Sequence, residues 1–351
     1  MFGNWHCFIP AVIHASIVSN QSHSLCIILS LVVNHGWPND MYQIRKIALT
    51  ISIFAVALLV AARPMPCKAC QVETGLTLTQ VKRTITKLRE LHTKPEKPKD
   101  GEWLKTHKEK GQTFSQYRKS KPNVLTGRRN KLYVQPIGDF TETDNELIAE
   151  SAEFLSIYFH CEVVINETLA ESVIPKTAQR EHPSWGVHQL LTSHILEKVL
   201  APKLPNDAFA TIAFTKSDLW PGDGWNFVFG YASFHERVGV WSLARFGDPE
   251  KNAETRKQCL LRTIKVATHE TGHMFSIAHC TKYRCNMQGS NSLEESDSQP
   301  LFLCPQCHAK ILYASGCKPE ERFKKLIEFC KEHELEDEQE YFEKTLALLG
   351  G

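Results

Sequence analysis

The chain has 351 residues, of which 42% are hydrophobic and 23% are charged, and its formal net charge at pH 7 is +2. This length and apolar content are sufficient for one large or two small globular domains with a real core. The near balance of charge excludes nucleic-acid binding through the charge of the whole chain, so any such contact would have to be local.

The first 66 residues contain two apolar tracts, over 7–33 and 47–62, separated by a polar, turn-prone stretch. The second tract follows Arg45 and Lys46 and ends in small residues, an order typical of a secretory signal or a short membrane anchor. Three interpretations stay open for residues 1–66: a true signal or anchor, a buried helical extension, or a translated segment that the working protein does not use.

Residues 67–130 predict a short helix and a basic connector. Cys67 and Cys70 form a C-x2-C pair without a second pair nearby, which favours incidental or redox-labile thiols over a metal site. Apolar residues at every third or fourth position predict an amphipathic helix over 77–91. From 94 to 131 the chain is rich in Lys, Arg and Pro. We interpret this stretch as a flexible, solvated linker, with weak contact to RNA or to an acidic surface as the alternative.

Regular structure is expected over 131–351, which we predict to be a single domain. Periodicity predicts these elements in chain order: a strand over 132–137, a helix over 145–159, a strand over 161–166, a helix over 185–200, a buried strand over 208–215, two strands within 218–246, and helices over 258–275, 323–331 and 340–349. The β-α-β opening is typical of a mixed sheet. Cys317 and Cys330 have no C-x2-C partner, so ordinary burial is expected for both.

Residues 269–273 have the sequence H-E-T-G-H, and this spacing places two histidine side chains on one face of a helix. Four residues separate His269 from His273, so both imidazoles project from one side and can hold a single Zn²⁺. Glu270 is one position along and misses the metal, but it can reach a water bound there and act as a general base. This arrangement predicts hydrolysis of peptide bonds.

A zinc ion held by two histidines needs a further protein ligand, and His279 supplies the spacing H-E-x-x-H-x5-H. On a straight helix His279 would lie about 15 Å beyond His269. We therefore expect the chain to turn back after His273.

Four cysteines, Cys280, Cys285, Cys304 and Cys307, follow as C-x4-C-x18-C-x2-C. This spacing is typical of a structural zinc site with four thiolates, and disulfides in an oxidising compartment are the alternative. Because Cys280 directly follows His279, the structural metal would fix the loop that carries the third histidine. The sequence thus predicts two zinc ions per chain, one catalytic and one structural.

The stretch 269–310 resembles the archaemetzincin family, in which a metzincin-type helix runs directly into a four-cysteine zinc site. The resemblance includes C-N-M-Q-G-S-N-S-L-E-E-S-D at 285–297 and L-C-P-Q-C at 303–307, and extends loosely over 131–313. It implies a compact α/β (α+β) fold with a mixed sheet, an active-site helix and a zinc lobe built on four cysteines. It also implies a zinc-dependent peptidase, with aminopeptidase action on peptides as one form.

Within metzincins a glycine makes the turn after the second histidine, and a methionine lies under the metal. Ser276 occupies the glycine position here, and Met287 fits the Met-turn. A non-glycine residue in a left-handed conformation costs about 1–2 kcal/mol. The resemblance also implies an edge strand that pairs with extended substrate, for which residues 218–246 are the candidate, with ordinary core packing of their aromatic residues as the alternative.

The predicted function is a zinc metallopeptidase acting on peptides or proteins. A catalytically weak or inactive zinc-stabilised peptide-binding scaffold is the first alternative. A nucleic-acid-binding protein is the second, and the position of the basic linker outside the metal lobe argues against it. The apolar run over 47–62 would favour membrane association or secretion, whereas the resemblance implies a soluble, cytoplasmic protein.

Overall fold

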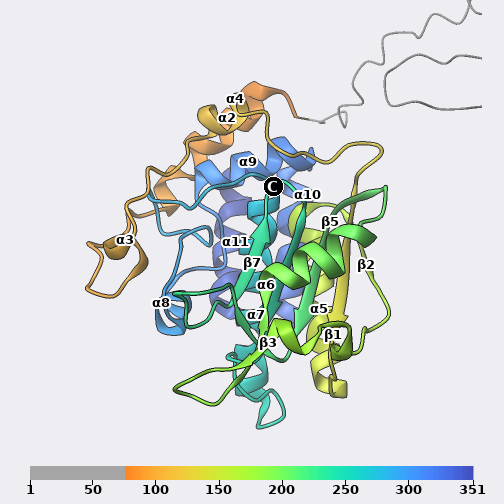
Figure 1. Cartoon of the computed structure of the whole chain (residues 1–351). Coiled ribbons are helices and arrows are strands. Elements are labelled where there is room, and N and C mark those ends of the chain that lie inside the picture. Colours follow the sequence, from red (N-terminus) through yellow and green to blue (C-terminus); the bar gives the residue numbers. More distant parts are fainter. Residues whose placement is uncertain (1–75, 351) are drawn as a thin grey trace, which may run out of the picture. The chain divides into compact units, whose positions relative to one another are not determined.

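A five-stranded mixed sheet lies at the centre of the computed structural model, which describes residues 76–350 (Figure 1). Its strand order is β2-β1-β5-β8-β7, with these bounds: β1 Lys131–Ile137, β2 Glu162–Ile165, β5 Ala208–Thr215, β7 Gly230–Ser233 and β8 Val238–Ser242. Neighbouring strands from β2 to β8 are parallel, and β7 is antiparallel to β8 at the sheet edge. Every residue of β5 and β8 is buried, as expected of central strands covered on both faces.

Helices cover one face of this sheet, and a shorter segment covers the other. Helices α5 (Glu142–Phe159) and α7 (Ala253–Met274) pack with alternate strand residues such as Ile212 and Trp241 in the larger core. The intervening residues, among them Ala213, pack on the opposite side against the turn Ile195–Leu200. This alternation follows from the two-residue period of a strand. The mixed α/β fold class predicted from the sequence is confirmed.

The helix expected over 185–200 is wrong in its first half. Residues His188–Leu191 form β4, which pairs with β3 (Gln179–Glu181) and β6 (Asp218–Trp220) in a separate three-stranded sheet. Residues 192–200 form one α-helical turn, α6 (Thr192–His194), and the π-helical turn Ile195–Leu200. The buried amide of Gln189 donates to Asp218 at 2.7 Å, a long-range contact that local periodicity does not record. Short 3₁₀ turns connect this region: Glu171–Val173, Lys176–Ala178 and Ala201–Lys203.

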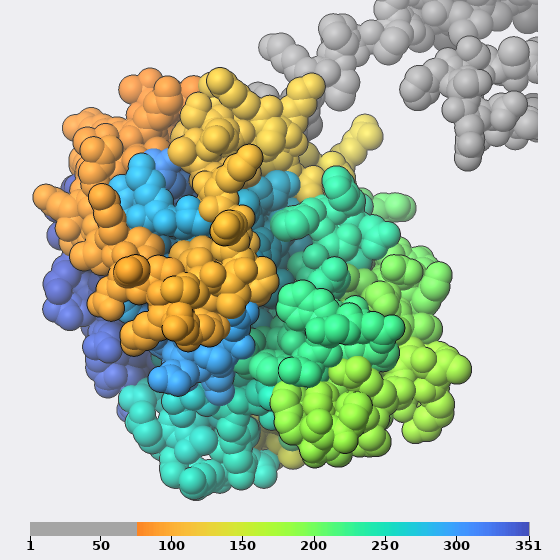
Figure 2. Space-filling view, turned by 60° about the vertical axis from the view of Figure 1, so that its left-hand side comes forward, coloured from red at the N-terminus to blue at the C-terminus, as the bar shows by residue number. Residues whose placement is uncertain are grey.

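The flexible linker expected over 94–131 is also wrong. After α2 (Leu78–Leu88) and a 3₁₀ turn (Arg89–Leu91), the chain forms α3 (Trp103–Thr106) and α4 (Phe114–Lys119). Phe114 and Tyr117 are buried in the larger core, and Leu125 N donates to Ala314 O at 2.9 Å. Phe114 and Tyr117 therefore attach the basic segment to the core. Figure 2 shows this orange segment covering part of the blue C-terminal region.

Four helices complete the C-terminal region: α8 (Leu293–Ser298), α9 (Pro305–Ser315), α10 (Pro319–Glu332) and α11 (Glu336–Leu349). The sequence predicted α10 and α11 but missed α8 and α9. Helix α9 begins directly at the C-P-Q-C sequence, where the Cys304 side chain caps it by accepting from Cys307 N. Cys317 and Cys330 are buried, as expected.

The predictions for residues 1–66 and for the Cys67–Cys70 pair lie outside the described residues. Within 76–350, no helix is both long and apolar enough to span a membrane. The described residues belong to one compact unit, and their packing does not separate a domain at residue 131.

Candidate metal centre

Three histidines meet at the C-terminal end of α7, as the spacing predicted. The Nε2 atom of His269 lies 3.1 Å from that of His273 and 3.2 Å from that of His279. Ligands about 2.0–2.1 Å from a tetrahedral zinc ion are about 3.3 Å apart, so the three nitrogens fit one zinc ion.

Each of these histidines has its Nδ1 atom next to an oxygen. The acceptors are Asn286 O at 2.7 Å from His269, Ile277 O at 2.7 Å from His273, and Glu109 Oε1 at 2.8 Å from His279. An acceptor at Nδ1 places the proton there and leaves the Nε2 lone pair free for a metal. Burial lowers the pKa of His269 to about 3 and that of His273 well below its usual value. Both rings are therefore neutral, as metal ligation requires.

The chain reverses direction at Ser276, as expected. Helix α7 ends at Met274, and Ser276 adopts a left-handed conformation with φ of 63°. Ser276 N donates to His273 O at 2.7 Å, and Ile277 N donates to Gly272 O at 3.2 Å. These bonds satisfy carbonyl groups at the end of the helix and return the chain so that His279 faces the other two histidines.

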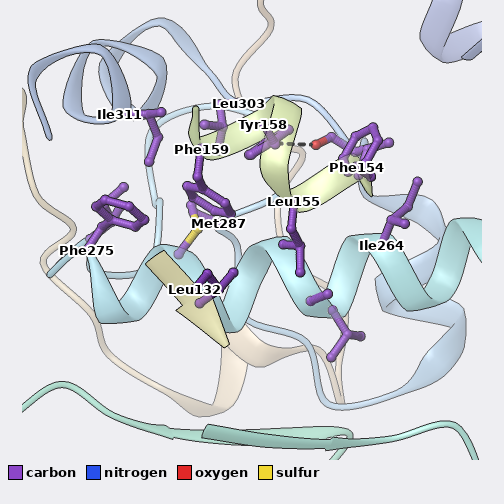
Figure 3. Packing of buried hydrophobic residues seen from close by; sticks show 14 of the residues in the cluster. Leu132, Phe154, Leu155, Tyr158, Phe159, Ile264, Phe275, Met287, Leu303 and Ile311 are labelled. Carbon is purple, nitrogen blue, oxygen red and sulfur yellow. Dashed lines mark hydrogen bonds between the residues drawn. The ribbon is translucent and has the colours of Figure 1, made fainter. Parts of the chain in front are cut away.

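Met287 packs against the helix turn between His269 and His273, and Figure 3 shows its side chain pointing toward α7. A Cβ atom added at Gly272 would lie 2.5 Å from Met287 Sδ, so only glycine leaves room at this position. Cys280 N donates to Met287 O at 2.6 Å. The loop that carries the methionine is thereby joined to the residue that follows the third histidine.

Glu270 lies beside the histidines against the edge strand β7. A Cβ atom at Gly230 would lie 2.9 Å from Glu270 Cγ, so the strand passes directly over the carboxylate stem. Burial raises the pKa of Glu270 to about 8. A carboxyl group with a raised pKa is suited to accept and return a proton near neutral pH.

The four predicted cysteines also meet at one point. Their sulfur atoms lie within 4.8 Å of one another, and the Sγ atoms of Cys280 and Cys304 are 3.6 Å apart. Thiolates about 2.3 Å from a tetrahedral zinc ion are about 3.8 Å apart, whereas a disulfide requires about 2.0 Å. The cysteines within the described residues are all free, which argues against the disulfide alternative there.

Polar groups around these sulfurs suit thiolates. Cys304 N lies 3.1 Å from Cys285 Sγ, and Cys307 N lies 3.5 Å from Cys304 Sγ. The buried ammonium group of Lys310 lies 3.8 Å from Cys307 Sγ. Donors and positive charge directed at sulfur stabilise the charged form that binds a metal.

A cleft of about 770 Å³ contains the histidines and Glu270. Strand β7 forms one wall, which places the predicted substrate strand beside the site. Trp103 and Glu109 line another part of the cleft, although the composition of their segment predicts a linker. The only signal for them was the set of aromatic residues interleaved with the basic run.

Comparison with known proteins confirms the resemblance seen in the sequence. The model of the family described as "Peptidase family M54" matches residues 188–312. Archaemetzincin-2 from Homo sapiens is 35% identical over 258 residues, which cover 64% of this chain and 71% of that protein. Archaemetzincin from Thermococcus kodakarensis is 33% identical over 185 residues, or 52% of this chain and 95% of the relative.

Crystal structures of archaeal relatives are similar as well. Archaemetzincin from Methanopyrus kandleri is 28% identical, with a TM-score of 0.44 over 53% of this chain and 94% of that one. Archaemetzincin from Archaeoglobus fulgidus, complexed with malonate, is 26% identical, with a TM-score of 0.40 over 51% of this chain and 99% of the other. On the strength of the sequence matches, the chain belongs to the archaemetzincin family of zinc metallopeptidases.

Proposed function

We propose that this chain hydrolyses peptide bonds with a zinc ion held by His269, His273 and His279 and with Glu270 as the general base. The observation that carries the proposal is the convergence of three imidazole Nε2 atoms, 3.1 and 3.2 Å apart, beside a carboxylate in an open cleft. Met287 packs against the helix turn between His269 and His273 and supports it.

A zinc ion bound there would supply a Lewis acid and lower the pKa of a coordinated water to about 7. The role of Glu270 is to accept a proton from the attacking water and return it to the leaving amine nitrogen. Its place against β7 favours this role, because the strand holds the carboxylate beside the scissile bond of a peptide that lies along the cleft.

The substrate that the cleft favours is an extended peptide. One edge of β7 pairs with β8, and the strand lies at the edge of its sheet and in the cleft wall. An added strand on such an edge gains main-chain hydrogen bonds without selecting particular side chains. Three exposed aromatic residues line the cleft, Trp225, Tyr231 and Phe234. They favour apolar side chains next to the scissile bond.

Aminopeptidase action is a narrower form of this proposal. A peptide with a free N-terminus and the same peptide with an acetylated N-terminus distinguish it from endopeptidase action. Release of the first residue from the free peptide alone supports an aminopeptidase, and internal cleavage of both peptides contradicts it. Peptides or proteins are the proposed partners, and we propose no role for nucleic acid.

The four cysteines are proposed to hold a second, structural zinc ion, giving two per chain. Their sulfur positions and the donors around them support this. Because Cys280 follows His279 directly, the structural site would fix the loop that carries the third histidine.

Ser276, in place of the motif glycine, favours one rival: a zinc-stabilised peptide-binding scaffold with weak or no turnover. Glu270→Gln separates the two. An enzyme loses hydrolysis of a mixed peptide library while keeping its zinc, whereas a scaffold shows no hydrolysis in either form. Glu254→Gln is the matched control, since it makes the same change at an exposed position in the first turn of α7.

A further inference from the structure

A segment outside the histidine motif holds the turn that carries the third histidine. Residues 109–123 cross the turn at 274–279 and contact it repeatedly, although they lie outside the residues 188–312 matched by the family model. The hydrogen bonds join His279 Nδ1 to Glu109 Oε1 (2.8 Å), Gln112 Nε2 to Ser276 O (3.3 Å), Ala278 N to Gln112 Oε1 (3.3 Å), Tyr117 Oη to Phe275 O (2.7 Å), Asn123 N to Ser276 Oγ (3.1 Å) and Asn123 Nδ2 to Met274 O (3.1 Å).

The contact from Glu109 differs from those that orient the other two histidines. His269 and His273 donate to main-chain carbonyl oxygens, which are neutral acceptors. His279 lies next to a carboxylate, and a charged acceptor at Nδ1 fixes the ring and makes Nε2 a stronger donor of electrons to a metal. The other oxygen of Glu109 is buried without a hydrogen-bond partner among the described residues. The polar contact of this carboxylate is therefore directed at His279.

The ring of His279 is also restrained from a second direction. Trp103 packs edge-on against it, with ring centroids 5.1 Å apart and an angle of 82° between the planes. Trp103 is itself held by its main-chain nitrogen, which donates to Glu295 Oε1 at 2.9 Å. Trp103 before Glu109 and Gln112 after it are thus both held by contacts with other parts of the chain. The carboxylate of Glu109 is therefore not on a free loop.

Tyr117 and Asn123 act on the turn itself. The fully buried Tyr117 satisfies Phe275 O, a carbonyl that α7 leaves without a helical partner at its end. Asn123 N meets the hydroxyl of Ser276, the residue held in the left-handed conformation. The segment therefore contacts the turn at the helix end, at the strained residue and at the ligand.

We propose that residues 109–123 are a positioning element of the metal centre, with Glu109 as the residue that orients His279. This inference rests on the proposed function, because it requires His279 to be a zinc ligand. It assigns a role at the site to a part of the chain that the histidine and cysteine motifs do not include.

The test uses the full chain with Glu109→Ala and Glu109→Gln. Glu96→Ala is the matched control, because Glu96 is an exposed carboxylate of the same region. Zinc affinity is measured by competition with a chelator, and Co²⁺ substituted into the histidine site reports ligand geometry through its visible absorption spectrum. We expect Glu109→Ala to weaken metal binding at the histidines about 10–100-fold, the range seen when such supporting partners are removed.

Further readouts separate positioning from a general loss of structure. Glu109→Ala should change the Co²⁺ spectrum and lower kcat with little change in KM, while the metal at the four cysteines stays bound. Glu109→Gln keeps the shape and an oxygen acceptor, so it should restore part of the affinity. If the alanine variant does not fold, the glutamine variant still tests the role of Glu109. Tyr117→Phe, which removes one hydroxyl, should give a smaller loss of metal affinity.

The inference is overturned if both Glu109 variants bind metal with the affinity and spectrum of the wild type while His273→Ala loses the metal. If His273→Ala also keeps the metal, the proposed function fails instead, so the two failures are distinguishable. A loss of the same size in Glu96→Ala would likewise contradict a specific role for Glu109.

Discussion

The hydroxyl oxygen of Ser276 lies 3.1 Å from the main-chain nitrogen of Asn123, a residue 153 positions earlier in the chain. The serine therefore has a hydrogen-bond partner in the position where the motif has glycine. A left-handed conformation costs a residue other than glycine about 1–2 kcal/mol. A hydrogen bond of this kind contributes about 0.5–1.5 kcal/mol, so it offsets most of that cost.

Replacing Ser276 by glycine should change stability little. The variant removes the backbone cost and loses the hydroxyl contact, so we expect the free energy of unfolding in urea to change by less than about 1 kcal/mol. Ser276→Val is the contrasting variant, because a β-branched residue is a true outlier in this conformation and also lacks the hydroxyl. Comparable stability of the valine and glycine variants would contradict this account. A large gain of peptidase activity in Ser276→Gly would show that the serine itself limits turnover.

Because Gly272 contacts Met287, we expect Gly272→Ala to destabilise the wild type but to stabilise a variant that lacks the Met287 side chain. In the wild type, Gly272→Ala places a Cβ atom 2.5 Å from Met287 Sδ. Overpacking of this kind costs about 1–3 kcal/mol, more than the gain of about 1 kcal/mol from helix propensity. In a Met287→Ala background the overlap is gone, so the same change should stabilise the fold. Urea unfolding of the four proteins measures this, and an equal effect in both backgrounds would contradict it.

Asp218 and Arg245 form a second testable pair. Arg245 donates to both carboxylate oxygens, at 2.8 and 2.7 Å, and the Asp218 side chain is 1% exposed. Arg245→Ala leaves that carboxylate without its counter-ion, a change that costs about 3–5 kcal/mol. The arginine also lies over Phe227, 3.6 Å from its ring centroid, in the cleft wall. We therefore expect a raised KM together with lower stability in urea.

The control for this prediction is Lys105→Ala. It breaks the pair with Asp100, whose side chain is 94% exposed, and such a surface pair contributes at most about 1 kcal/mol. Similar losses from the two substitutions would show that burial does not govern the Asp218 pair.

Removing one of the four clustered cysteines should affect both proposed metal sites. Cys285→Ser is expected to lower the zinc content from two ions per chain to one. It should also weaken binding at the histidines, because Cys280 and Met287 are joined by a main-chain hydrogen bond within the shared loop. Metal analysis and chelator competition measure the two effects. Cys161→Ser, outside both clusters, is the control, and an unchanged zinc content in Cys285→Ser would refute the structural site.

Buried strands and ligand clusters were the features most accessible from sequence. The strand at 208–215 was predicted at its observed bounds, because every residue of β5 is buried and the apolar run is continuous. The histidines and cysteines could be found because each set has a local spacing that metal geometry constrains. The start of α7 was missed by five residues, since its first turn is polar and is fixed by the Asn252 cap.

Contacts between distant segments account for what the sequence did not reveal. Glu109 meets His279 across 170 positions, and no spacing rule relates the two residues. The charges around Trp103 and Tyr117 resembled a solvated linker, because composition does not show which few residues of a basic run are buried. Strand β4 was likewise hidden, since its buried Gln189 has its partner on a different strand.

The long separation of Glu109 from His279 also bears on how the protein matures. Closing a loop of this size costs conformational entropy that only later packing repays, so we expect this contact to form late in folding. A molecule that has not yet made this contact would carry the H-E-T-G-H helix before Glu109 has oriented His279. Such molecules would hold a metal at the histidines more weakly than the finished fold does, so the order of folding would itself delay completion of the site.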